Sequence, residues 1–282
     1  MVELIKKLMK NLVLFIFFLS NTVFSQNRSI LWEAKKDSVS IFILGSNHLY
    51  PIDSISNKEK VNKIISESDV FFTELNPNSD AVDSIFSSRK NNNIKKKLGN
   101  SYTIYTSLFP DYKYLDKLTS KEIWFKLYKK KIELSCQYNG SQKMEDYFSD
   151  RARDKKTIEF EDSQEQLNQI DKAFTSTDNQ MWEYIKNLLH KIHEKDLNSE
   201  CVDGAKITNN NYQFEFNKIT SKENKQTWDD RNIKWLDKLE KEISENHYKN
   251  IFVMVGIGHL DYSNGLVMLL KNKGFIVKPI IL

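Results

Sequence analysis

The sequence predicts an α/β protein, with a central mixed β-sheet built from N- and C-terminal segments and a large helical region between them. Short apolar runs rich in β-forming residues gather near both ends of the chain, as in IFILGSNHL at 41–49 and FVMVGIGHL at 252–260. The middle, from roughly 79 to 240, is rich in Lys, Glu and Asn with regularly spaced aromatic residues, which favours helices. The chain has only 8 glycines and 4 prolines, which argues against an all-β sandwich with many tight turns.

The chain is long enough to bury one large core, because it has 282 residues of which 40% are hydrophobic and 12% aromatic. We therefore expect a single large domain. Its 42 basic and 38 acidic residues give a net charge of +4 that is spread along the sequence. Since no basic block comparable with a nucleic-acid-binding patch is present, nucleic acid is not an expected partner.

The first 25 residues form a separate segment. Lysines at positions 6, 7 and 10 precede an apolar run at 12–19, and small or polar residues follow it. This order is typical of a secretory signal peptide, here residues 1–25, which would leave a domain of residues 26–282. The run is shorter than the ~20 residues that span a bilayer, so we expect an exported protein, periplasmic or secreted, with no stable membrane span after cleavage. An uncleaved N-terminal anchor is the alternative.

Export would place Cys136 and Cys201 in an oxidising compartment, where they could form one disulfide. Sequence leaves this pairing open, because it does not show whether the two Cα atoms come within bridging distance. The two cysteines are far apart and have no histidine nearby, so a zinc site is not expected at them.

In the N-terminal part, ILWEA and DSVSIFILGSNH are expected to be the two strands of a hairpin, with the turn region at 35–37. A helix is predicted at 56–68, where apolar residues recur at helical spacing behind a capping Ser or Asn. The apolar run at 69–75 predicts another strand. This β–α–β unit would place His48 and Glu74 at the ends of neighbouring strands, where parallel sheets bind ligands.

The remaining elements follow from the same periodicities. They are predicted helices at 142–155, 164–174, 228–244 and 264–273, and predicted strands at 157–161, 250–255 and 275–280. The helix at 228–244 is amphipathic, and its inward stripe is predicted to be Ile233, Leu236, Leu239 and Ile243.

Two histidines, His48 and His259, each follow a buried strand and a glycine. Glycine at a strand end allows a sharp turn and close approach of a ligand, and imidazole can serve there as metal ligand or general base. A histidine that merely caps a strand is the alternative for one such motif. Two of them favour a shared site, because a sheet can bring the first and last strands side by side. Glu74 adds a carboxylate that would be costly to bury unless paired or ligating.

Two further charged residues are candidates. Glu161 ends a predicted strand, with Gln166 on the helix that follows, and Arg231 lies in WDDRNIKWL, where a solvated helix start is the alternative. Two histidines and one or two carboxylates are a ligand set that suits a divalent metal such as Mn, Co, Fe or Zn. Such an ion polarises a carbonyl and lowers the pKa of a bound water to about 7. His190 and His193 could also bind a metal, but with no third ligand in sight they are expected to be a solvated surface pair.

The order of these motifs resembles the TraB/GumN family, which includes metal-dependent proteases of the Tiki type. The resemblance extends from Leu31 to Ile280, and its strongest pieces are LGSNH at 44–48, DVFFTEL at 69–75, VGIGHL at 255–260 and NGLVMLLKNKGFIV at 264–277. It implies an active site made from two G-x-x-H motifs, at 45–48 and 256–259, and a glutamate. It also implies that two related halves share one cleft, each contributing one histidine.

Two other family motifs can be placed on this chain. The central pattern L-E-T-x-x-x-Q aligns with residues 160–166, and the pattern Arg-Asn-x-x-Trp aligns with residues 231–235. The chain departs from the family at three places. Ser46 stands for a threonine but keeps the hydroxyl, Asp162 stands for a threonine and adds charge, and Asp261-Tyr262 stands where a small residue is usual. None of these changes removes an implied ligand.

The function that the resemblance implies is an exported divalent-metal-dependent hydrolase, most simply a peptidase acting on a peptide or protein. His48 and His259 would ligate a Mn, Co or Zn ion, with Glu74 as third ligand or general base. Glu161 and Arg231 would support these groups or the transition state, and Arg231 suits a developing oxyanion. A non-catalytic envelope binding module and an ester or lactone hydrolase are the alternatives, and the oligomeric state stays open.

Overall fold

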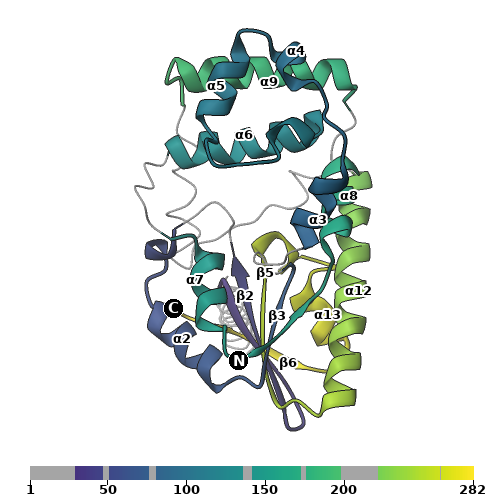
Figure 1. The fold of residues 1–282 in the computed structure, drawn as a ribbon. Helices are drawn as coiled ribbons and strands as arrows, with labels where there is room; N and C mark the ends of the chain where they lie inside the picture. Colours follow the sequence, from purple (N-terminus) through teal and green to yellow (C-terminus); the bar gives the residue numbers. More distant parts are fainter. Residues whose placement is uncertain are drawn as a thin grey trace, which may run out of the picture.

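The computed structural model describes residues 29–46, 51–75, 81–135, 142–172, 176–197, 222–260 and 262–282. They form two lobes, one above the other in Figure 1. The sheet lobe contains the β-sheet and the helices packed on its faces. The helical lobe contains α4 (Ile94–Leu98), α5 (Ser101–Ser107), α6 (Ser120–Ser135) and α9 (Asp178–His193).

Six strands form one mixed sheet with the order β4-β3-β5-β2-β1-β6. Their bounds are β1 Leu31–Lys36, β2 Val39–Ser46, β3 Val70–Thr73, β4 Lys156–Glu159, β5 Asn250–Gly256 and β6 Ile276–Ile280. The strands β4, β3, β5 and β2 run parallel, whereas β1 is antiparallel to both of its neighbours. The predicted α/β class and mixed sheet are therefore confirmed, but the relation between two halves of the chain is not.

The register of the parallel strands determines where the sheet ends. Gly45 of β2 is paired with Val255 of β5, and Ser46 is paired with Gly256. The two G-x-x-H motifs therefore leave the sheet from adjacent strand ends. On the other side of β5, β3 and β4 end at the same edge, so residues that follow these four strands converge there.

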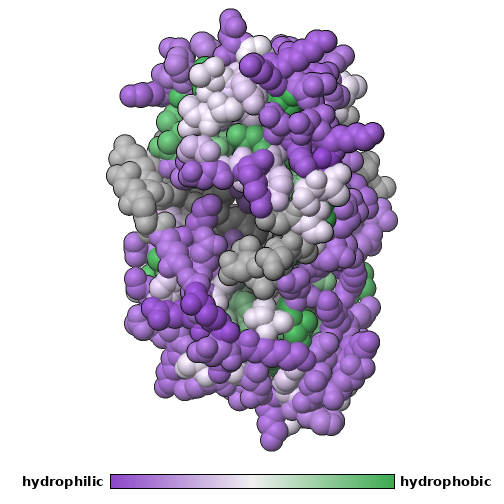
Figure 2. Space-filling view, in the orientation of Figure 1, coloured by the Kyte–Doolittle hydropathy of each residue, from purple (hydrophilic) through white to green (hydrophobic). Residues whose placement is uncertain are grey.

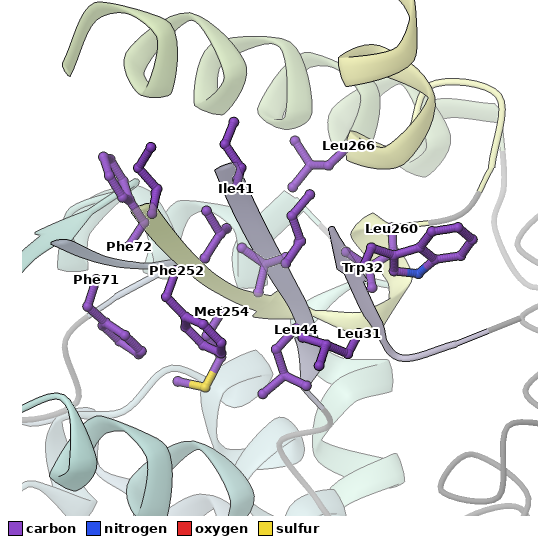
Figure 3. Packing of buried hydrophobic residues seen from close by; sticks show 14 of the residues in the cluster. Leu31, Trp32, Ile41, Leu44, Phe71, Phe72, Phe252, Met254, Leu260 and Leu266 are labelled. Atoms are coloured by element: carbon purple, nitrogen blue, oxygen red, sulfur yellow. The ribbon is translucent and has the colours of Figure 1, made fainter. Parts of the chain in front are cut away.

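Helices cover both faces of the sheet (Figure 1). On one face lie α2 (Lys58–Glu67) and α7 (Met144–Arg151), and on the other lie α12 (Lys222–Asn246) and α13 (Leu266–Asn272). Side chains alternate between the faces of each strand, as Phe71 and Phe72 show in Figure 3. Phe71 stacks on Phe252 with ring centroids 5.7 Å apart, and Phe72 stacks on Phe160 at 5.3 Å. The sheet is thus the middle layer of a three-layer core.

The helical lobe has a core of its own. Its fully buried side chains include Tyr105, Ile123, Leu127, Ile185 and Leu189. Two further helices, α3 (Ala81–Ser88) and α8 (Ser163–Lys172), lie between the lobes in Figure 1. None of the helices in the described part of the chain is both long and apolar enough to cross a membrane.

The predicted elements are confirmed with small shifts at their ends, except on α12. This helix begins at Lys222, and Ile233, predicted to face the core, is 49% exposed. The buried stripe consists of Asn232, Trp235, Leu236 and Leu239, which follow the i, i+3, i+4, i+7 spacing. The prediction for Ile233 was wrong because the first buried position of the stripe is polar. His190 and His193 are both exposed, as expected of a surface pair.

Several predictions concern residues outside the described part of the chain. They are the signal peptide at 1–25, His48 with the end of the first G-x-x-H motif, Asp261, and both cysteines, Cys136 and Cys201.

Candidate active site

Four side chains predicted to carry chemistry meet at the carboxyl edge of the sheet. Glu74 follows β3, Glu161 follows β4, and His259 lies in the short 3-10 helix Ile257–His259 that follows β5. Backbone bonds extend the ladder beyond the strands, because the Glu161 N–H donates to the Glu74 carbonyl over 3.0 Å. Arg231 reaches these residues from α12.

The Glu74 carboxylate is held from two sides. Its Oε1 accepts the Gly256 N–H over 2.5 Å, and its Oε2 accepts Arg231 Nη2 over 3.3 Å. The first of these bonds comes from the glycine that opens the second G-x-x-H motif. With 9% exposure, the carboxylate is nearly removed from water, and these two donors offset the cost of burying its charge.

Glu161 is buried more deeply, at 4% exposure, and accepts four hydrogen bonds. Its Oε1 accepts Arg231 Nε over 2.5 Å and Trp235 Nε1 over 3.0 Å. Its Oε2 accepts Arg231 Nη2 and Gln166 Nε2, each over 3.1 Å. The two Arg231 bonds form a fork, the strong geometry of an arginine–carboxylate pair. Glu161 therefore fixes the position of Arg231.

Arg231 links the two carboxylates. Its guanidinium lies 4.8 Å from the Trp235 ring and binds Glu161 and Glu74 at once. With 13% of the side chain exposed, the alternative of a solvated helix start is wrong. Among the described residues Nη1 makes no hydrogen bond, so this nitrogen can donate to a ligand. The three side chains together carry a net charge of one negative unit.

The imidazole of His259 is 2% exposed and lies between two indole rings. Trp228 stacks on it with ring centroids 4.3 Å apart and an interplanar angle of 12°, and Trp235 lies at 4.3 Å and 38°. Its Nδ1 is 2.6 Å from Asn232 Oδ1. The two faces of the ring are thereby covered, and only its edge is available for chemistry.

Asn232 determines which nitrogen of His259 carries the proton. Its Nδ2 donates to the Asn264 carbonyl over 2.9 Å and to the Tyr262 hydroxyl over 2.8 Å. Because a carbonyl can only accept, the amide nitrogen must lie on that side, and Oδ1 accepts from Nδ1–H of His259. A neutral imidazole in this tautomer presents the lone pair of Nε2, which lies 4.0 Å from Glu74 Oε1.

This pair fits a metal ion. Zinc binds imidazole nitrogen and carboxylate oxygen at about 2.0–2.2 Å, so one ion can reach both atoms across 4.0 Å. Metal-binding histidines usually donate their other N–H to a carboxylate or carbonyl oxygen, as His259 does to Asn232. In the described ranges no group of three or more His, Cys, Asp or Glu side chains is arranged to hold an ion, so a third protein ligand would come from outside them.

The two G-x-x-H motifs touch at Gly45. A Cβ atom at this position would lie 2.6 Å from Leu260 Cδ1 and 3.1 Å from Ile257 Cα, so a side chain here would force these neighbours to shift. One residue further along, the Ser46 hydroxyl contacts Glu145 Oε1 of α7 at 2.5 Å. The retained hydroxyl at position 46 therefore connects the end of β2 to the first turn of α7.

The sequence alone did not identify three residues that position the side chains of the site. Trp228 covers the His259 ring, and Tyr262 and Asn264 orient the Asn232 amide. Burial, with the nearby Asp229 carboxylate, raises the pKa of Tyr262. A signal for Trp228 exists in the W-x-x-x-N-x-x-W spacing, which places all three side chains on one helix face. Tyr262, which stands where the family usually has a small residue, therefore supports the site through Asn232.

The sequence model of the TraB/PrgY/gumN family matches residues 30–279, which is nearly the whole chain. No curated protein and no solved structure matches it. The matched range contains β1 to β5, all but the last residue of β6, and the described side chains of the candidate site. The chain therefore belongs to the TraB/PrgY/gumN family.

Proposed function

We propose that this protein is a divalent-metal-dependent hydrolase that cleaves peptide bonds. The observation that carries the proposal is the pair of His259 Nε2 and Glu74 Oε1, 4.0 Å apart at a nearly water-free edge of the sheet. Both groups are oriented by residues of one helix, α12, through Asn232 and Arg231. Such support of each ligand is typical of built metal sites rather than of structural histidines.

His259 and Glu74 would hold the ion together with His48, whose strand ends beside Gly256. A divalent cation there would polarise the scissile carbonyl and lower the pKa of water to about 7. A mixed imidazole and carboxylate set suits Mn, Co or Zn. The proposal includes export directed by residues 1–25, with cleavage before Gln26, which sequencing of the mature N-terminus would test.

The residues of the chain supply the remaining steps. Glu74, as third ligand or general base, would accept a proton from water while the water oxygen bonds to the carbonyl carbon. Arg231 Nη1 would donate to the carbonyl oxygen as it gains negative charge. The C–N bond then breaks, and the leaving amine takes up the proton. Trp228 and Trp235 keep water away from the faces of the imidazole.

Metal affinity is the decisive measurement. The purified protein is titrated with Mn²⁺, Co²⁺ and Zn²⁺ by calorimetry, beside His48→Ala, His259→Ala and the exposed control His190→Ala. We expect tight binding that both site variants lose and that the control retains. Hydrolysis of a mixed peptide library is then followed by mass spectrometry. A folded wild-type protein that binds none of these ions refutes the metallohydrolase, and peptide binding without cleavage in the loaded protein indicates a binding module.

A further inference from the structure

Three lysines belong to elements near the carboxyl edge of the sheet. Lys126 and Lys129 are one turn apart on α6 and therefore share a face of that helix. Lys143 precedes the first turn of α7 and forms an isolated bridge with Pro51, which places it beside the chain that follows β2. All three belong to elements that border the space between the two lobes, where the surface is hollowed in Figure 2.

Lys129 on α6 interacts electrostatically with carboxylates of the sheet lobe. In Figure 1, α6 is the helix of the helical lobe that faces the carboxyl edge of the sheet. Burial lowers the pKa of Lys129 overall, and the carboxylates of Glu145 and Glu74 oppose that shift. Glu145 is the residue that contacts the Ser46 hydroxyl at the end of β2. Lys129 is therefore close enough to Glu145 and to the candidate catalytic carboxylate, Glu74, for their charges to interact.

Aromatic rings, and not carboxylates, are the immediate neighbours of these ammonium groups. Lys126 Nζ lies 3.7 Å from the centroid of the Tyr112 ring and 5.0 Å from that of Phe109. Lys129 Nζ lies 4.7 Å from the centroid of Phe125. In the part of the chain that the structure describes, neither ammonium has a carboxylate within ion-pair distance. Partly buried cations without an ionic partner are costly, and an anionic ligand would offset that cost.

The acidic neighbours of the three lysines are Glu145 and Asp146 on α7 and Glu74 at the edge of the sheet, so three lysines face three carboxylates. Two of these carboxylates bind other donors, because Glu145 accepts the Ser46 hydroxyl and Glu74 accepts the Gly256 N–H and Arg231 Nη2. Burial and the repulsion of Lys129 and Lys143 lower the pKa of Lys126 to about 8. The lysines themselves have no carboxylate partner at ion-pair distance among the described residues, so a ligand carboxylate could bind them directly.

We propose that Lys126, Lys129 and Lys143 form a carboxylate-binding subsite beside the candidate active site. This rests on the proposed function, because it assigns to the hydrolase peptides that carry an acidic group near the cleaved bond. The carboxylate would bind the lysines of the helical lobe, and the rings of Tyr112 and Phe125 would contact the apolar part of the same residue. The negative charge around Glu74 would repel the acidic end from the floor of the site, and this would orient the peptide.

Three matched peptides test the subsite without turnover. They share one sequence and an uncharged coumarin label at the N-terminus. The first has a central glutamate and an amidated C-terminus, the second has glutamine at that position, and the third has the glutamine but a free C-terminal carboxylate. Binding is measured by fluorescence anisotropy with a chelator present, so that the result does not depend on catalysis. The first and third peptides separate a side-chain carboxylate from a terminal one.

We expect one carboxylate peptide to bind at least about tenfold more tightly than the neutral peptide, the factor that one charge-assisted hydrogen bond provides. This preference should be lost in Lys129→Met and retained in Lys129→Arg. It should also be retained in the control Lys130→Met, which removes a charge of the same helix that pairs with Glu133. The variants are checked for folding by circular dichroism.

The outcomes distinguish the subsite from the reaction. Equal affinity for the three peptides, no binding of any of them, or a preference unchanged in a folded Lys126→Met/Lys129→Met variant overturns the subsite. Hydrolysis of peptides by the metal-loaded protein without preference for carboxylates also overturns it and leaves the hydrolase standing. A carboxylate preference in a protein that cleaves nothing with any metal supports the subsite and refutes the hydrolase.

Discussion

Glu161→Gln removes the charge that holds Arg231 in place. In the folded protein the carboxylate accepts both Arg231 donors, the Trp235 indole N–H and the Gln166 amide. A glutamine offers one acceptor oxygen and brings an NH₂ group into a site surrounded by donors. Breaking a buried ion pair by removing one partner costs about 3–5 kcal/mol, because the other charge stays buried without compensation. Glu74, 3.3 Å from Arg231 Nη2, would compensate only part of that charge.

The loss in the free energy of unfolding lowers the melting temperature. A domain of 150–250 residues changes its melting temperature by about 2–4 °C per kcal/mol, so the variant should melt about 6–20 °C below the wild type. Glu165→Gln is the matched control, since Glu165 of α8 pairs with Lys234, also on α12, but at the surface. Exposed pairs contribute at most about 1 kcal/mol, and glutamine can keep the capping box of α8.

The assay follows thermal unfolding by circular dichroism and by tryptophan fluorescence at neutral pH. Fluorescence reports on all five tryptophans, among them Trp228 and Trp235 of the site, and dichroism reports on the helices of both lobes. Equal melting shifts for Glu161→Gln and Glu165→Gln would refute the reasoning, because the four hydrogen bonds at Glu161 would then contribute no more than a surface pair.

Three further predictions follow from single contacts. Asn232→Ala should weaken metal binding about 10–100-fold in calorimetry, because the tautomer of His259 is no longer fixed. Gly45→Ala should destabilise the fold by about 1–3 kcal/mol in urea titrations, because its Cβ would meet Leu260 Cδ1 at 2.6 Å. Lys126→Met should melt above the wild type at pH 7. That difference should shrink as pH rises from about 8 towards 10.5, since only the unfolded wild type then keeps the lysine proton.

Each of these three predictions would be contradicted by a specific result. Unchanged metal affinity in a folded Asn232→Ala would mean that Asn232 has no role in presenting Nε2. A Gly45→Ala protein as stable as the wild type would show that Leu260 moves aside freely. A Lys126→Met advantage that grows with pH would have the wrong sign for a lysine whose pKa is lowered by folding.

The sequence predicted the strands and their ends well, because apolar runs that stop at a glycine or a charge have few other physical explanations. It also predicted that Glu74, Glu161, Arg231 and His259 belong to one site, and the structure brings these four together. Their partners could not be predicted. Glu161 and Arg231 are 70 positions apart, and only the packing of α12 on the sheet edge shows that they form an ion pair.

The burial of polar residues was the main obstacle to predicting the site from the sequence. Asn232 is fully buried because Tyr262, Asn264 and His259 satisfy the hydrogen bonds of its amide. These three residues lie between 27 and 32 positions further along the chain. A pattern based on apolar residues alone predicts that Asn232 is exposed and that Ile233 is buried instead. The electrostatic interaction of Lys129 with Glu145 and Glu74 could not be predicted either, since lysine on a helix usually indicates an exposed face.

The central position of β5 has a consequence for how the chain folds. This strand separates β2 from β3, yet its residues follow β2 by about two hundred positions and lie close to the C-terminus. Until residues 250–256 are available, the N-terminal hairpin and the β3–β4 pair have no strand between them and remain two unjoined edges. Such long-range pairing slows folding. The nascent chain therefore cannot complete its sheet, or assemble the site at the edge of that sheet, before residues 250–256 have been synthesised.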